Sequence, residues 1–372
     1  MVEVRVASAR FTSMLANRGM STEQFSEGLS AEVDLAALIV SDQDLPFEHV
    51  VALASRFKKT WPYLLIDEPE RRTRHGSDNR TVANRAVPLS ATLLDQLARV
   101  EAMLDWSAEL FPEVIARVPD QPIGTGTTAR DASGWIRSLL GVTADAQIAA
   151  AGPYGSLRLW SEALQACGVF VQMRRLEDPT VRAFSVIAGD QAVVVADTHD
   201  IPYARVFSLL HEYVHIILRS AGICDLDDQV AVERYCNEVA AQVLMPVDLM
   251  RRELGRAPWG LTTEDDEERV ASISARLGVS KATFLIRLHE MGVLSDDEHA
   301  ELERRRLARP GKPDSKGGNY HRNAINKVGR RFAQRVVGAY EAGAIDRRDA
   351  STMLEIPEHN FPGLRTELGK AG

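Results

Sequence analysis

The pentapeptide His211-Glu212-Tyr213-Val214-His215 constrains the fold more than any other feature of this sequence. It lies within an apolar stretch, Val206 to Ile217, that has the length and composition of a buried helix. Burying two histidines and a glutamate in such a helix is costly unless other groups satisfy them. Because helix positions i and i+4 are about 40° apart on one face, both imidazoles can reach a single metal ion.

Zinc suits this spacing, because neutral imidazole nitrogens are among its usual ligands. A catalytic zinc site has three protein ligands and one open position, at which the pKa of a water molecule is lowered towards about 7. Glu212 lies about 100° around the helix from His211, where a carboxylate can act as general base without being a ligand. The motif predicts a zinc hydrolase; the alternative is a pair of surface or hydrogen-bonded histidines.

The third ligand must come from outside the motif. The metzincin pattern requires Gly at position 218 and His at position 221, and the chain has Leu218 and Ala221 there. A glutamate on a following helix is the other solution, and Glu233 lies 18 residues after His215. By residue chemistry alone the candidates stay open: Glu233, Cys224, Asp225, Asp227, Asp228, Cys236 and Glu238.

The composition excludes several classes of protein. Of the 372 residues, 45% are hydrophobic and 26% are charged, which is typical of folded domains and not of disordered or collagen-like chains. The formal net charge of −8 argues against a globally basic nucleic-acid-binding protein. The three cysteines form no CxxC pair, so a disulfide framework is not expected. With no signal-peptide pattern and no long apolar run, we expect a cytoplasmic protein with no membrane partner.

Changes in hydrophobic periodicity divide the chain into successive segments. Residues 1–75 read as short helices and residues 76–167 as a helical connecting region. Residues 168–295 combine strands with helices, residues 309–318 form a linker rich in Gly, Pro and Lys, and residues 319–372 form a helical tail.

Strands are predicted at 169–171, 183–188 and 192–196, the last two joined by a turn at Gly189-Asp190-Gln191. Helices are predicted from Pro202 to about Ser220 and from Gln229 to about Val243. The predicted fold class is therefore α+β and mainly helical, with a small antiparallel sheet.

The N-terminal helices allow two interpretations. A bundle of short helices is typical of a helix-turn-helix DNA reader, but also of a packing or dimerisation bundle. Residues 31–39, where a second helix is expected, contain no Lys or Arg to meet phosphate, which makes DNA binding weakly supported.

A second motif follows the HExxH helix. The stretch from Glu233 to Pro246 reads E-x-x-C-N-x-V-A-A-x-x-L-M-P, and Arg205 to His215 carries the first motif. Together they resemble the ImmA/IrrE family of metallopeptidases, strongly over residues 168–246. Residues 46–69 are similar to the segment that precedes the peptidase in longer members, often a degenerate helix-turn-helix of the Xre type. Residues 271–294 are similar to the module that follows it.

The resemblance implies a zincin-like peptidase core in which His211, His215 and Glu233 hold zinc and Glu212 is the general base. It implies limited proteolysis of a protein substrate, an Xre-type transcriptional repressor, in a stress or mobile-element response. Related members are encoded beside toxins, which makes an antitoxin-like or DNA-binding regulator with a silent peptidase site the alternative.

Four further positions and one strand are candidates for supporting roles. Asn237, one turn after Glu233, is placed to hold a ligand through a hydrogen bond. Tyr203, Tyr213 and Tyr235 are equivalent candidates for the oxyanion donor. An extended substrate is expected to add as a strand along residues 192–196.

Overall fold

The protein is described from a computed structural model of the full chain. It describes residues 3–17, 21–26, 33–57, 61–65, 67–69, 74–76, 90–121, 123–124, 126–150, 152–178, 181–220, 229–255, 264–296 and 319–370. The predicted linker at 309–318 lies outside these ranges. The chain divides into two compact units, one formed by residues 1–75 and 89–103 and the other by residues 76–88 and 104–372. The segment boundaries expected from periodicity stay predictions.

The first unit combines short helices with a two-stranded sheet. Strands β1 (Glu3–Val6) and β2 (Gln43–Pro46) pair antiparallel, with Glu3 opposite Pro46. The other elements are α1 (Ser8–Asn17), α2 (Thr22–Ser26), α3 (Leu35–Val40), α4 (Phe47–Arg56) and the 3-10 helix η1 (Trp61–Leu65). Its core is built around three buried phenylalanines, Phe11, Phe25 and Phe57, whose ring centroids are 4.5 to 5.6 Å apart.

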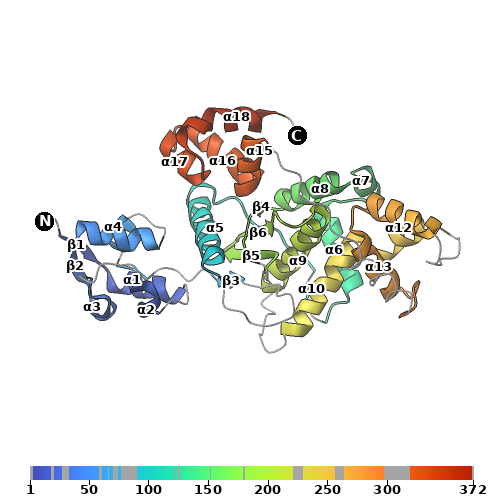
Figure 1. Ribbon diagram of the computed structural model, residues 1–372, viewed down its shortest axis with the longest axis horizontal. Coiled ribbons are helices and arrows are strands. Elements are labelled where there is room, and N and C mark those ends of the chain that lie inside the picture. Colours follow the sequence, from blue (N-terminus) through green and yellow to red (C-terminus); the bar gives the residue numbers. More distant parts are fainter. Residues whose placement is uncertain are drawn as a thin grey trace. The chain divides into compact units, whose positions relative to one another are not determined.

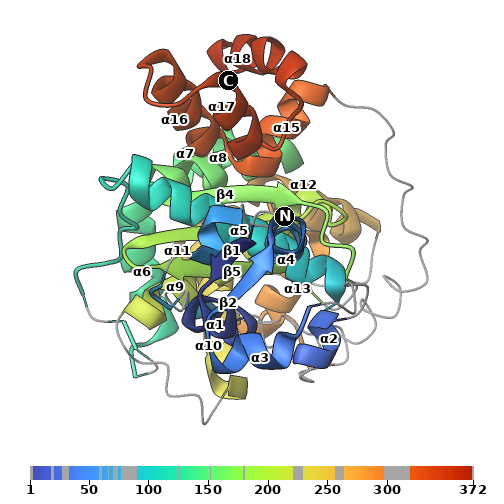
Figure 2. The same cartoon turned by 90° about the vertical axis from the view of Figure 1, so that its left-hand side faces the viewer.

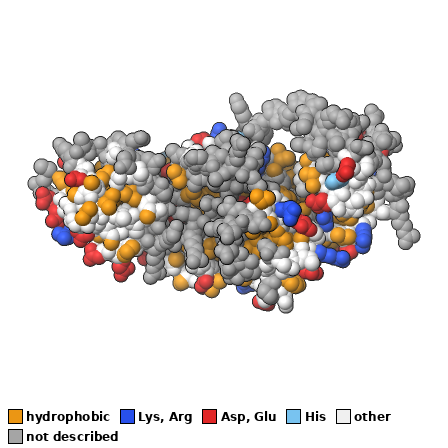
Figure 3. All heavy atoms as spheres, turned by 90° about the horizontal axis from the view of Figure 1, so that it is seen from below, with side chains coloured by type: hydrophobic (Ala, Val, Ile, Leu, Met, Phe, Trp, Pro, Cys, Tyr) orange, Lys and Arg blue, Asp and Glu red, His pale blue; other side chains and the backbone are white. Residues whose placement is uncertain are grey.

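The charge of the first unit bears on the DNA-binding interpretation. Helix α3 has the sequence LAALIV and therefore no cationic side chain. The face of this unit visible in Figure 3 carries mainly hydrophobic and acidic side chains. Both observations favour a packing role over phosphate contact for this part of the chain.

The second unit is built on strands β4, β5 and β6 of a sheet with the order β3-β5-β6-β4, and the division between the units falls within β3. Strands β5 (Ala183–Ala188) and β6 (Gln191–Asp197) form the predicted antiparallel hairpin. Strand β4 (Val169–Arg174) pairs with the other side of β6 and runs parallel to it, while β3 (Arg74–Gly76) is short. The sheet is thus mixed and not purely antiparallel as predicted, because the connection from β4 to β5 carries the chain past the position of β6.

The strand expected to receive the substrate, residues 192–196, is not at the edge of the sheet. Every residue of β6 from Gln191 to Asp197 is buried, and the strand is paired on both sides. An edge strand has free backbone groups for an incoming peptide, and β6 is an interior strand. The substrate therefore cannot add along residues 192–196.

Helices cover both faces of this sheet (Figure 1). On one face, alternate residues of β4 and β6, such as Val171 and Val194, join a core with helices α8 (Pro153–Ala166), α9 (Pro202–Ser220) and α10 (Gln229–Leu244). The predicted bounds of the helices at 202 and 229 are confirmed. Helix α5 (Ala91–Leu110) contains the division between the units, and the remaining helices of this part are α6 (Ala129–Leu140), α7 (Ala144–Ala149), α11 (Val247–Leu254), α12 (Glu264–Leu277) and α13 (Lys281–Glu290).

The C-terminal helices pack on β4 (Figure 2). They are α15 (Tyr320–Val328), α16 (Arg330–Glu341), α17 (Arg347–Met353) and α18 (Phe361–Gly369), with the 3-10 helix η3 (Glu358–Asn360) before α18. Helix α15 ends at Val328 and α16 begins at Arg330, and Gly329 between them has φ of 90°. A side chain at Gly329 would meet the Val171 carbonyl oxygen at 2.6 Å, so only glycine allows this close approach to the strand.

Candidate metal centre

Helix α9 carries the HExxH motif into the interior of the second unit. His211, Glu212 and His215 are all fully buried, and apolar side chains such as Leu210 and Val214 anchor the neighbouring helix faces in the core. The two imidazoles lie on one face of α9, one turn apart, with ring centroids 4.7 Å apart. The helix thus fixes the geometry that the i, i+4 spacing predicts.

Helix α10 brings Glu233 to the same point. The last carbonyl groups of α10 have no hydrogen-bond partners within the helix and need donors from other side chains. Arg137 donates to the Val243 carbonyl at 2.6 Å, Gln147 to the Leu244 carbonyl at 2.8 Å, and Arg287 to the Met245 carbonyl just beyond the helix at 3.3 Å. These contacts fix the C-terminal end of the helix whose first turns carry Glu233.

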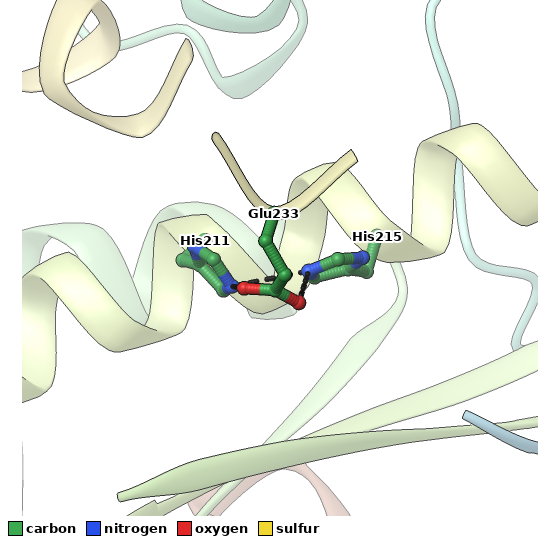
Figure 4. A group of neighbouring side chains, drawn as sticks. All are labelled: His211, His215 and Glu233. Carbon is green, nitrogen blue, oxygen red and sulfur yellow. Dashed lines mark hydrogen bonds and ion pairs between the residues drawn. The ribbon is translucent and has the colours of Figure 1, made fainter. Parts of the chain in front are cut away.

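The three side chains converge on one small volume (Figure 4). The Nε2 atoms of His211 and His215 are 3.0 Å apart. The Glu233 carboxylate places Oε2 at 3.3 Å from His211 Nε2 and Oε1 at 3.2 Å from His215 Nε2. Ligands at the corners of a tetrahedron around zinc are about 3.3 to 3.4 Å apart when each is about 2.0 to 2.1 Å from the ion. The donor set and its spacing therefore fit zinc.

The charge state of Glu233 also fits a ligand. Burial raises the pKa of this carboxyl group, but hydrogen bonds and charge interactions with His211 and His215 outweigh burial and hold the pKa well below its usual range. Glu233 is therefore a carboxylate, the form that binds a metal ion.

The other candidates for a third ligand differ in placement. Cys236 is buried with Sγ 3.5 Å from Nδ1 of His215, on the side of the ring opposite the converging Nε2 atoms. Glu238 is exposed and accepts a hydrogen bond from Gln242. The other candidates lie outside the described residues: Cys224, Asp225, Asp227 and Asp228. Among the described residues, His211, His215 and Glu233 form the group whose possible ligand atoms all lie within 4.8 Å of one another.

Ser185 is a site residue that the sequence analysis missed. It is buried on β5, and its hydroxyl donates a hydrogen bond of 2.8 Å to Oε2 of the buried Glu212 carboxylate. This bond fixes the orientation of Glu212 from the sheet side. The only sequence signal is a hydroxyl residue in the apolar strand AFSVIA, which reads equally well as a small packing residue.

The structure separates the tyrosine candidates for the oxyanion donor. Tyr213 is fully buried, and its hydroxyl donates to the Arg117 carbonyl at 2.7 Å, so its role is to anchor α9. Burial raises the pKa of Tyr235 to about 12, with Glu238 and Asp131 adding to the shift. Tyr203 and Tyr235 stay candidates.

A cleft of about 1070 Å³ opens beside the three converging side chains. Glu233 and Asn237 of α10 form part of its lining, together with residues of α9 and α13. Small-molecule pockets have volumes of about 300 to 1,000 Å³, so this open cleft has room for a peptide segment.

This part of the chain is similar to a known family of domains. Residues 164–289 match the family model Peptidase M78, described as the IrrE N-terminal-like domain. The matched range contains the sheet strands β4 to β6, the HExxH helix, Glu233 and most of α13. A search of the curated proteins finds no match. None of the helices that the structure describes has the length and apolar character needed to cross a membrane.

Proposed function

We propose that this protein is a zinc-dependent endopeptidase that makes a limited cut in a protein partner. The match of residues 164–289 to the Peptidase M78 family model, the IrrE N-terminal-like domain, supports this proposal. The observation that carries the proposal is the convergence of His211, His215 and Glu233 at one point beside a cleft. The resemblance of the sequence to its family supports an Xre-type transcriptional repressor as the substrate, cut in the cytoplasm during a stress or mobile-element response.

His211, His215 and Glu233 are the residues that would hold the metal ion. A bound zinc ion would be a Lewis acid, able to polarise a peptide carbonyl and lower the pKa of water. Glu212 takes a proton from the attacking water and returns it to the leaving amine. Ser185 keeps the Glu212 carboxylate oriented through the hydrogen bond from β5. His211, Glu212 and His215 are fully buried, which limits the access of bulk water to these groups.

The first experiment measures the metal content of the purified protein and of the variants His211→Ala and Glu233→Ala. We expect about one zinc ion per chain in the unmodified protein and none in either variant. Full zinc content in both variants would refute the assignment of the ligands.

The second experiment compares the unmodified protein with Glu212→Gln in a cleavage assay on Xre-type repressors encoded near this protein. We expect the variant to keep zinc and lose cleavage, because an amide cannot accept the proton. If Glu212→Gln retains the biological activity, the protein is a regulator that acts by binding, as an antitoxin or on DNA, and its peptidase site is silent.

A further inference from the structure

Polar side chains that line the cleft beside the metal-binding group form hydrogen bonds and ion pairs with one another. Arg182 donates to Asp200, Arg287 is 2.9 Å from Glu290, and Gln242 donates to Glu238 at 3.4 Å. The lining contains three arginines and four carboxylates, so that the positive and negative charges largely compensate each other. The lining therefore gives no strong preference for a highly charged substrate.

Three larger apolar side chains from three different helices share the same cleft. They are Phe207 of α9, Val230 of α10 and Ile286 of α13. Val230 is 61% exposed and Ile286 is 45% exposed, although both are β-branched hydrophobic residues that normally pack in a core. Apolar side chains that gather in a cleft with a polar rim are typical of a binding site.

These side chains lie next to the metal-binding group. Phe207 is one turn before His211 on α9, and the two rings stack with centroids 6.5 Å apart and an interplanar angle of 28°. Val230 precedes Glu233 by three residues on α10, so it lies one turn from the third ligand. Ile286 adds an apolar side chain from α13 to the lining of the same cleft.

We propose that Phe207, Val230 and Ile286 form an apolar subsite that receives an aliphatic or aromatic side chain of the substrate next to the bond that is cut. Ile286 is the specificity-determining residue of this subsite, since it lies on neither of the two helices that carry the metal ligands. This inference rests on the proposed peptidase function and adds the substrate class: a polypeptide segment with an apolar residue beside the cut site.

The test measures the binding of peptides to the protein, which does not require that they are cleaved. Two decapeptide pools, identical except for Leu or Ser at one fixed central position, are measured by fluorescence anisotropy on the zinc-loaded Glu212→Gln protein. We expect binding of the Leu pool to be at least about 10-fold tighter, a typical discrimination for an apolar pocket. Ile286→Asp, introduced into the same protein, is expected to abolish the preference.

The matched control is Ile115→Asp, which introduces the same change at an isoleucine that is 52% exposed and does not line the cleft. It is expected to keep the preference for Leu. Equal binding of both pools, or an unchanged preference in Ile286→Asp, would overturn the subsite. Failure of the peptidase proposal gives a different result: the Leu preference and its loss in Ile286→Asp persist, while the unmodified protein cleaves neither pool.

Discussion

The contact between the C-terminal helices and the sheet centres on one buried ion pair, and its contribution to stability can be predicted. Arg174 on β4 is only 1% exposed in its side chain and pairs with Glu355, which is 13% exposed. A second guanidinium nitrogen of Arg174 is 3.2 Å from Oε2 of Glu355, and Lys327 is 2.8 Å from the same oxygen. Burial opposes ionisation of Glu355, but the two cations outweigh burial and lower its pKa to about 2.

The size of the Glu355 pKa shift gives the expected loss of stability. A fall from 4.5 to about 2 corresponds to about 3 kcal/mol of unfolding free energy, because each pKa unit is about 1.4 kcal/mol. This agrees with the loss of stability of about 3 to 5 kcal/mol that is typical when one partner of a buried ion pair is removed and the other charge stays buried. We therefore expect Glu355→Gln, which keeps the shape and leaves Arg174 buried without its counter-charge, to destabilise this region by about 3 kcal/mol at pH 7.

The pH dependence of stability tests the same pKa shift in a second way. Since the pKa of Glu355 is depressed in the folded protein, its contribution is complete above the unfolded value of 4.5 and is lost as the pH falls towards about 2. At pH 3.5 about 1.4 kcal/mol of the difference between the two proteins should already have disappeared.

The assay is native-state hydrogen exchange of the amides in β4 and α15, followed from pH 7 downwards, with urea unfolding alongside. Glu341→Gln is the matched control, because the Glu341–Arg365 pair lies in the same group of helices but both side chains are more than half exposed. It should change stability by less than about 0.5 kcal/mol. The reasoning is refuted if Glu355→Gln behaves like this control, or if their difference does not depend on pH.

Three further predictions concern the site and its supports. Ser185→Ala should lower kcat for the cleaved substrate roughly 10-fold or more, because it removes a hydrogen bond to a charged group, while zinc content and KM stay unchanged and Ser185→Thr recovers part of the rate; a normal kcat in Ser185→Ala would contradict the orienting role. Arg137→Met should lower the free energy of unfolding by about 2 kcal/mol and weaken zinc binding in a chelator competition, because it leaves the Val243 carbonyl without its donor. The control is Arg130→Met, at an exposed arginine. Equal effects of the two substitutions would count against the role of Arg137 at the end of α10. Truncation after Asp296 should cause aggregation measurable by light scattering, because it uncovers β4 and Phe170; a monomeric truncated protein of unchanged melting temperature would show that the C-terminal helices are dispensable.

The sequence predicted those parts of the site that depend on local periodicity. The bounds of α9 follow from Pro202 and an apolar helical face, and the hairpin of β5 and β6 follows from Gly189-Asp190. The pairing of β1 with β2 was missed because its partners are about 40 positions apart and leave no periodic signal. The parallel direction of β4 was also missed, since it depends on the path of the connection to β5 and not on the residues of the strand itself.

The side chains that support the site were the least predictable part. Ser185 acts through a partner 27 positions away, and Arg137 acts through a carbonyl 106 positions away. Neither residue stands out in its own segment, because a serine in a strand and an arginine on a helix are both ordinary. Their roles arise only once the tertiary structure brings a buried carboxylate or an open helix end beside them.

The folding unit of the peptidase extends beyond the range that matches its family. The match ends at residue 289, but β4 inside that range depends on residues beyond 319. Gln172 donates to the Val328 carbonyl, Arg174 requires Glu355, and the Phe170 ring packs edge-on against Phe332 at 5.8 Å. Without these partners, β4 would expose a buried cation and an aromatic ring on the strand that pairs with β6. Since β6 in turn contacts α9, we conclude that the C-terminal helices maintain the sheet on which α9, the helix with the candidate metal ligands His211 and His215, rests.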